Sequence, residues 1–264
     1  MQIDLTAKQA LVTGASAGIG FAIAKGLAAA GANVTLVGRD SGRLEQAAAA
    51  LRQLKLKGDI ATVEADIATA EGCQLLLAQL PETDILVNNL GIYGAVPFFD
   101  ISDDVWLQML EVNLMSAVRL SRHYAKAMQQ RGWGRIQFIS SESALNIPAE
   151  MVHYGVSKAA MQGLSRGLAK VLAGSGVTVN SILPGPTRTE GAIKMMADLA
   201  ACRGVSTSEM EKLFLAENRP SSLLQRFATP EEVANLCVYV ASEQASATTG
   251  AALKVEGGIV ESMG

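Results

Sequence analysis

Short apolar runs alternate along the chain with longer segments in which apolar residues recur every three or four positions. A continuous apolar run is typical of a strand buried on both faces of a parallel sheet, and the longer period is typical of an amphipathic helix. The runs that predict strands are Ala10–Thr13, Asn33–Val37, Ile60–Ala65, Ile85–Asn88, Arg135–Ser140, Val177–Leu183 and Ala251–Val255. The segments that predict helices lie near residues 18–30, 41–56, 69–79, 103–130, 152–174 and 230–241. This alternation predicts an α/β fold with a doubly wound, mostly parallel seven-stranded sheet and helices on both faces.

Two of the predicted helices carry clear start signals. Thr229 is placed to be an N-cap, Pro230 fits the first helical position, and Glu232 completes a capping box. Ser102 stands before two aspartates, which suit the positive end of a helix dipole. No linker, repeat or low-complexity tract divides the sequence, so residues 1–264 are expected to form a single domain.

The stretch from Glu190 to Gln225 interrupts the alternation. It has no strand pattern, only an amphipathic helical pattern that carries Met and Leu and follows the last glycine-proline turn, Pro184 to Pro186. Ligands of open α/β sheets bind beyond the carboxyl ends of the strands, so residues 190–225 are expected to form a substrate lid. Methionine suits irregular apolar ligands, which favours an apolar or amphipathic substrate. An oligomer contact or a surface helix pair is the alternative interpretation.

A glycine-rich turn, Thr13-Gly-Ala-Ser-Ala-Gly-Ile-Gly20, lies between the first predicted strand and the first predicted helix. Its glycines, at positions 14, 18 and 20, allow the backbone to approach a ligand closely, and the free amides at a helix N-terminus attract an anion. The turn lacks the Gly-Lys-Ser/Thr ending of a P-loop. Strand, turn and helix in this order predict a site for a dinucleotide pyrophosphate.

Composition narrows the classes of partner. The 264 residues are 49% hydrophobic and 18% charged, with a net charge of -3 and no basic run, which argues against nucleic acid. The three cysteines form no C-x-x-C pair and suit a reducing compartment, so a cytoplasmic location is expected. His123 and His153 are too few for a metal site. The sequence shows neither a signal-peptide pattern nor an apolar run of membrane-spanning length.

The candidate chemistry centres on Tyr154 and Lys158, which are four residues apart on one predicted helix and therefore share a face. A neighbouring cation is expected to lower the pKa of the tyrosine from its ordinary value of about 10 and make it an acid/base near neutral pH. Ser141 lies 13 residues earlier, just after a predicted strand, and Asn88-Asn89-Leu90-Gly91 ends another strand in the same way. The carboxyl ends of these strands are where catalytic groups belong in this architecture.

With these residues the chain resembles the short-chain dehydrogenase/reductase family, in its shorter single-domain branch. The resemblance covers nearly the whole chain. The segments that carry it are TGASAGIG from Thr13, Asn88 to Gly91, Asn113 in its helix, Ser141, Tyr154 with Lys158, Pro184-Gly185 followed by Thr189, Thr249-Gly250 and Glu256-Gly257-Gly258. Leu90 and Glu256 depart from the family pattern, which has alanine and aspartate there.

The resemblance implies a Rossmann-type oxidoreductase that transfers a hydride between a nicotinamide cofactor and a carbonyl or secondary alcohol. It implies that Tyr154 transfers the proton, Ser141 hydrogen-bonds the substrate oxygen, Lys158 holds the nicotinamide ribose, and Asn113 positions a water that relays protons to Lys158. The residues expected to bind the cofactor are Gly14, Ser16, Ala17, Gly18, Ile19, Gly20, Arg39, Asp66, Ile67, Asn89, Gly91, Tyr154, Lys158, Pro184, Gly185, Thr187 and Thr189.

The end of the second predicted strand bears on which cofactor is used. Asp40 lies 20 residues after Gly20, a spacing that suits the acid of an NAD site, but the family's acid aligns with Gly38. Arg39 follows instead, and a guanidinium pairs well with a 2′-phosphate. Asp40 is more simply a helix N-cap. NADP(H) is therefore favoured and NAD(H) stays open, because Ala17 stands where many NADP-using relatives carry a basic residue.

The substrate is less well specified. Candidate pocket residues are Tyr93, Ser143, Leu145, His153 and Met195. The leading function is an NADP(H)-dependent carbonyl reductase or alcohol dehydrogenase, and a 3-oxoacyl thioester reductase is the alternative within the enzyme class. A non-catalytic dinucleotide-binding regulator is the alternative of another class. The resemblance also implies a homotetramer or homodimer.

Overall fold

A computed structural model describes residues 2–262. Its centre is one seven-stranded sheet in the order β3-β2-β1-β4-β5-β6-β7, in which every neighbouring pair is parallel. The strands are β1 (Gln9–Thr13), β2 (Asn33–Gly38), β3 (Ile60–Glu64), β4 (Ile85–Asn88), β5 (Gly134–Ile139), β6 (Val177–Pro184) and β7 (Ala252–Val255). The predicted α/β class and doubly wound sheet are confirmed, with each predicted strand within one residue of the observed bounds.

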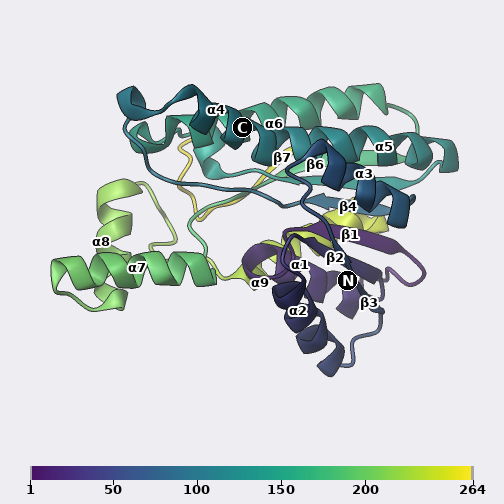
Figure 1. The fold of residues 1–264 in the computed structure, drawn as a ribbon, viewed down its shortest axis with the longest axis horizontal. Coiled ribbons are helices and arrows are strands. Elements are labelled where there is room, and N and C mark those ends of the chain that lie inside the picture. Colours follow the sequence, from purple (N-terminus) through teal and green to yellow (C-terminus); the bar gives the residue numbers. More distant parts are fainter. Residues whose placement is uncertain (1, 263–264) are drawn as a thin grey trace.

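Helices cover both faces of this sheet (Figure 1). They are α1 (Gly18–Ala29), α2 (Ser41–Gln53), α3 (Ala70–Gln79), α4 (Asp103–Leu110), α5 (Ser116–Arg131), α6 (Val152–Val171), α7 (Glu190–Arg203), α8 (Thr207–Asn218) and α9 (Pro230–Ala241). The helix expected over 103–130 is divided, because a π-helical turn at Glu111–Met115 separates α4 from α5. Such turns are frequent at functional sites, and this one contains Asn113.

Two apolar cores lie on opposite faces of the sheet. Alternate residues of β1 divide between them, since Ala10 and Val12 pack with α1, α2 and α9 whereas Leu11 packs with α3, α5 and α6. The twofold alternation of side chains along a strand produces this division. The sheet is therefore buried on both faces, as the continuous apolar runs predict.

The expected helix caps are present. Thr229 and Glu232 form a reciprocal capping box at the start of α9, and Ser102 accepts a hydrogen bond from the Val105 amide at the start of α4. Asp40 accepts a hydrogen bond from the Arg43 amide at 3.0 Å and caps α2, as expected. Its carboxylate is thereby engaged in holding the helix start.

The stretch from Glu190 to Gln225 contains α7 and α8, which project beside the carboxyl-end edge of the sheet, at the left of Figure 1. The two helices share a small apolar core that includes Met196, Met210 and Leu215. Part of their amphipathic pattern is thus satisfied within the pair itself. In residues 2–262, no helix combines the length and apolar character needed to cross a membrane.

Candidate active site

A cavity of about 610 Å³ lies where the glycine-rich turn, the loops after β4, β5 and β6, and the α7–α8 pair meet. The point between β1 and β4, where the strand order reverses, opens towards this cavity, as expected for a doubly wound sheet. The predicted site residues that line it are Ala17, Gly18, Ile19, Gly20, Asn89, Gly91, Tyr93, Ser141, Ser143, Tyr154, Lys158, Pro184, Gly185, Thr187, Thr189 and Met195. Residues from distant parts of the sequence therefore form one site.

The glycine-rich turn has the shape that a pyrophosphate cradle requires. Gly14 and Gly18 adopt positive φ angles of 63° and 57°, a region that favours glycine. A Cβ on Gly20 would lie 2.5 Å from the Gly14 carbonyl oxygen and 2.5 Å from Asn89 Nδ2. The Asn89 amide donates to the carbonyls of Thr13 and Gly14, at 2.9 and 3.1 Å, and fixes the turn against the end of β4. The turn thus fits the backbone-mediated binding of a dinucleotide phosphate.

The first turn of α1 has no side-chain cap, because Ala17 occupies the N-cap position. The free amides of this turn therefore have no serine or threonine side chain at the N-cap to satisfy them. One amide is engaged from elsewhere in the chain: Gly18 N–H donates to the Glu190 carboxylate at 3.0 Å. An anion-binding position at the turn thus carries a carboxylate from the start of α7.

Lys158 lines the cavity but is almost completely buried, at 4% exposure. Its Nζ donates to the Ile139 carbonyl at 2.8 Å and lies 5.8 Å from the centre of the Tyr154 ring. Burial disfavours the ammonium form and lowers the pKa of Lys158 to about 8. The lysine is therefore still mainly a cation at neutral pH and holds a fixed position beside the tyrosine.

The protonation of Tyr154 differs from the sequence-based expectation. Burial raises the pKa of Tyr154 above its ordinary value, the Ser141 hydroxyl acts in the opposite direction, and the negative charge of Glu142 raises it further. The expected lowering by Lys158 is wrong for this structure, because desolvation of the phenolate outweighs every attractive interaction around it. Tyr154 is thus a phenol at neutral pH, which is the form that donates a proton.

Asn113 lies behind the cavity rather than on its surface. Its side chain is fully buried; Oδ1 accepts from the Ile92 amide at 2.8 Å, and Nδ2 donates to the Ile92 carbonyl at 3.0 Å and to Ser157 Oγ at 2.9 Å. The asparagine therefore fastens the loop after β4 to α6, the helix that carries Tyr154 and Lys158. Its expected role with a relay water stays a prediction.

Several other predicted residues do not line this cavity. Arg39 is exposed at the end of β2, and Asp66 and Ile67 follow β3 at the same edge of the sheet. Gly14 and Ser16 belong to the glycine-rich turn without lining the cavity. The remaining two are candidate pocket residues: Leu145 is 46% exposed, and His153 is fully buried with its ring against Trp106.

Four charged residues of the site were not named from the sequence: Arg43, Glu142, Glu190 and Arg219 all line the cavity. Arg43 lies in the first turn of α2, close in sequence to Arg39, and that proximity was an available signal. Glu142 directly follows Ser141, and this position next to a candidate catalytic hydroxyl was a second signal available in the sequence. Nothing in the sequence indicates Arg219, because its partner is 77 residues away.

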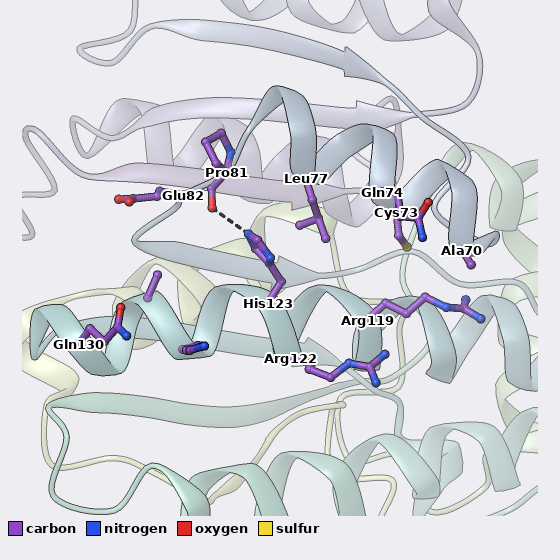
Figure 2. A pocket seen from close by; sticks show the side chains of 12 residues that line it. Ala70, Cys73, Gln74, Leu77, Pro81, Glu82, Arg119, Arg122, His123 and Gln130 are labelled. Atoms are coloured by element: carbon purple, nitrogen blue, oxygen red, sulfur yellow. Dashed lines mark hydrogen bonds between the residues drawn. The ribbon is translucent and has the colours of Figure 1, made fainter.

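A second groove, of about 660 Å³, lies between α3 and α5, away from all of these residues (Figure 2). Its walls carry Arg119, Arg122 and His123 from α5, and the His123 ring makes a hydrogen bond with the Pro81 carbonyl at 2.9 Å. None of the predicted catalytic or cofactor-binding residues lines it, so this groove is not the predicted active site.

Comparisons with known proteins agree with this fold. A family model described as short chain dehydrogenase matches residues 8–200. The chain is 42% identical over 263 residues to the uncharacterized oxidoreductase YvaG of Bacillus subtilis (strain 168), with 100% of both chains covered. It is 32% identical over 259 residues to the 3-oxoacyl-acyl-carrier-protein reductase FabG of Rickettsia felis, with 98% of this chain and 99% of that protein covered.

The fold also matches a solved enzyme structure. L-sorbose reductase from Gluconobacter frateurii, in a crystal structure complexed with NADPH and L-sorbose, superposes with a TM-score of 0.93. The two proteins are 34% identical, and the match covers 100% of both chains.

Proposed function

This chain belongs to the short-chain dehydrogenase family and is a dinucleotide-dependent oxidoreductase of carbonyl and alcohol groups, and from that premise we propose that its cofactor is NADP(H) and its substrate an amphipathic ketone or secondary alcohol. The observation that carries the proposal is the convergence of Ser141, Tyr154 and Lys158 with the glycine-rich turn in one cavity. A bound nicotinamide supplies or accepts the hydride.

We assign the proton transfer to Tyr154. The raised pKa of Tyr154 keeps it a phenol at neutral pH, ready to donate to the oxygen of a substrate carbonyl. Ser141, on the same cavity wall, stabilises the charge that develops on that oxygen. The Lys158 cation is held by the Ile139 carbonyl and favours the tyrosinate left after transfer. We also assign to Lys158 the binding of the cofactor's ribose.

Two arginines support the preference for NADP(H). Arg39 is exposed at the end of β2, and Arg43 reaches the cavity from the first turn of α2. Gly38, where a carboxylate would favour NAD, has no side chain, and Asp40 is engaged as the cap of α2. A guanidinium in this region is complementary to a 2′-phosphate. The solved neighbour L-sorbose reductase is itself a complex with NADPH.

The α7–α8 pair supports an amphipathic substrate. Met195 and Phe214 from these helices line the cavity together with Phe227, so one wall is apolar. We propose that residues 190–225 act as a lid that closes over a substrate bound against this apolar wall. Amide hydrogen exchange with and without NADPH plus substrate tests the lid. Slower exchange of residues 190–225 in the complex is expected, and equal exchange in both states contradicts it.

A 3-oxoacyl thioester reductase is the second candidate within the enzyme class. The 32% identity to FabG of Rickettsia felis favours it. The reading as a non-catalytic regulator is set aside, because the relatives are oxidoreductases. NADPH and NADH oxidation should be measured on a panel of simple ketones, hydroxy ketones and 3-oxoacyl thioesters. Turnover of ketones with NADPH is the expected result, and turnover of thioesters alone contradicts the leading proposal.

We further propose a cytoplasmic homotetramer or homodimer. All three cysteines are unpaired, which suits a reducing compartment. Near α4, Phe99 is 96% exposed and Leu107 is 63% exposed, and large apolar side chains in such positions suit a contact between subunits. Light scattering coupled to size-exclusion chromatography tests this, and a monomer contradicts it.

A further inference from the structure

A buried ion pair forms part of the cavity wall next to Ser141. Arg219 Nε donates to Glu142 Oε1 at 2.7 Å, and the two side chains are 9% and 4% exposed. Glu142 begins the turn after β5, whereas Arg219 directly follows α8 of the proposed lid as its C-cap. Both line the same cavity as Tyr154. Burying two charges costs free energy that their mutual attraction only partly offsets, so stability alone does not account for this pair.

The second carboxylate oxygen of Glu142, Oε2, has more hydrogen-bond donors around it than it has acceptor positions. Oε2 accepts from Ser141 Oγ at 2.5 Å, from the Ser143 amide at 2.6 Å and from Ser143 Oγ at 2.9 Å. A carboxylate offers roughly four acceptor positions over two oxygens, or about two on Oε2. One of the three donors is therefore replaceable, and a ligand hydroxyl is the chemical group that would replace it.

This arrangement also occupies the hydrogen of Ser141. The single hydroxyl hydrogen of Ser141 points to Glu142, while its oxygen accepts from the Ser143 amide at 3.1 Å. A substrate carbonyl needs a donor at this position. Ser141 can supply one only when another group takes its place on the Glu142 carboxylate.

The chemistry around the pair limits what that group can be. Glu142 and Arg219 neutralise one another, so the wall does not present a free cation to a substrate carboxylate. Within the described residues, Arg219 Nη2 makes no hydrogen bond, while Nη1 donates to the Asn218 carbonyl at 2.7 Å. An acceptor carboxylate and a donor guanidinium lying side by side fit a neutral hydroxyl, which both donates and accepts.

We propose that Glu142, held by Arg219, selects substrates that carry a hydroxyl group on the carbon next to the carbonyl: α-hydroxy ketones, or vicinal diols in the reverse direction. The inference rests on the proposed function, because the carbonyl oxygen lies between Ser141 and Tyr154. The hydroxyl of the neighbouring carbon then donates to Glu142 Oε2. Ser141 is released from that oxygen and turns its hydrogen to the carbonyl, so substrate recognition and carbonyl polarisation are coupled.

The test compares matched substrates with NADPH: butan-2-one against 3-hydroxybutan-2-one, and cyclohexanone against 2-hydroxycyclohexanone. A hydrogen bond to a charged group predicts that kcat/KM favours the hydroxy ketone by about 10- to 100-fold. Because release of Ser141 acts on the chemical step, part of this ratio is expected in kcat. Equal rates on both members of each pair overturn the inference and leave the proposed function standing. Oxidation of neither NADPH nor NADH by any ketone overturns both together.

Variants separate recognition from a structural role. Glu142→Gln keeps the shape of the side chain, but one carboxylate oxygen becomes an NH₂ group that cannot accept a hydrogen bond. The ratio of kcat/KM for the hydroxy ketone to kcat/KM for the matched simple ketone is therefore expected to fall to within a few-fold of one. The double variant Glu142→Gln/Arg219→Met removes both charges and should show the same fall while avoiding a buried unpaired cation. Glu209→Gln and Arg203→Met, two exposed lid residues outside the cavity, are matched controls and should keep the wild-type ratio.

Folding of each variant is checked by its melting temperature and its NADPH affinity. If the Glu142–Arg219 ion pair only held the lid in position, its loss would change the rates on the hydroxy ketone and on the simple ketone together and leave their ratio unaltered. An unchanged ratio in a folded variant therefore overturns the inference. A 2-oxo acid that is preferred over the hydroxy ketone also overturns it, because Arg219 would then read a carboxylate. If both variants fail to fold, the ratio of kcat/KM for hydroxy and simple ketones in the wild-type protein still tests the proposed selectivity.

Discussion

The carboxylate of Glu190, the first residue of α7, accepts a hydrogen bond from the Gly18 amide in the glycine-rich turn, 172 residues away in the chain, at 3.0 Å. Thr189 packs on the same glycine, since a Cβ built there would lie 3.0 Å from Thr189 Cγ2. The start of the proposed lid thus rests on the turn expected to hold the pyrophosphate. We therefore expect a dinucleotide phosphate and the Glu190 carboxylate to compete for the Gly18 amide.

The first prediction concerns this competition. Glu190→Gln removes a negative charge that prefers the positive end of α1, an interaction of about 0.3–1 kcal/mol. NADPH affinity should therefore rise by about 2- to 5-fold, as measured by isothermal titration calorimetry. Glu209→Gln, an exposed acid on α8, is the control and should bind as the wild type does. Weaker binding by the Glu190 variant would show that the carboxylate assists the cofactor.

The second prediction concerns Tyr154. Replacing it by Phe removes the proton donor, and general acid catalysis contributes about 10²- to 10⁴-fold, so turnover should fall by that factor. NADPH affinity and melting temperature should change little. Tyr239→Phe is the control, because Tyr239 lies in α9 and does not line the cavity. Wild-type turnover in the Tyr154 variant contradicts the assignment.

The third prediction concerns cofactor choice at Gly38. Gly38→Asp places a carboxylate near the expected 2′-phosphate and offers an acceptor to an unmodified ribose. Like charges in a partly desolvated site cost several kcal/mol, so the NADPH-to-NADH ratio of kcat/KM should fall by at least about tenfold. The nearest atom to a Cβ at this position is Leu44 Cδ1 at 3.5 Å, an ordinary contact distance, so a Cβ is accommodated there.

Two arginine variants accompany this test. Arg39→Ala and Arg43→Ala should each weaken NADPH binding more than NADH binding. Arg122→Ala, an exposed arginine of the groove between α3 and α5, is the control. A wild type that already prefers NADH contradicts the role given to Gly38 and Arg39.

The fourth prediction links the buried Lys158 to the pH dependence of stability. Burial lowers its pKa from 10.5 to about 8. Between these two values the unfolded chain binds more protons, so wild-type stability gains a contribution as pH rises through this range. Below pH 8 the folded state holds the cation at a cost of up to about 3 kcal/mol, since one pKa unit corresponds to about 1.4 kcal/mol.

Lys158→Met removes that cost together with activity. The variant should be more stable than wild type at about pH 6.5. The gain in its free energy of unfolding is reduced by roughly 1 kcal/mol, because the hydrogen bond to the Ile139 carbonyl is lost. The difference should shrink as pH approaches about 10. Urea unfolding across this range measures it. A stability difference that does not vary with pH shows that Lys158 is not held with a lowered pKa.

Local patterns in the sequence were sufficient for the architecture and for much of the candidate site. Strand bounds and caps depend on residues within a few positions of one another, as in the Thr229 capping box and the apolar run of β1. The same holds for Tyr154 and Lys158, which share a helix face because they are four residues apart. The parallel order of the sheet then brings the ends of β1, β4, β5 and β6 to one edge, so residues placed after those strands converge.

The tertiary structure alone decided the electrostatics and the lid contacts. The raised pKa of Tyr154 follows from how much of the phenol is desolvated, which depends on packing by distant segments. Glu142 meets Arg219 across 77 residues and Gly18 meets Glu190 across 172, at distances set by how α7 and α8 dock beside the sheet. Helix periodicity determines which residues share a face, but the position of that face against another element is determined by long-range packing, which no local pattern encodes.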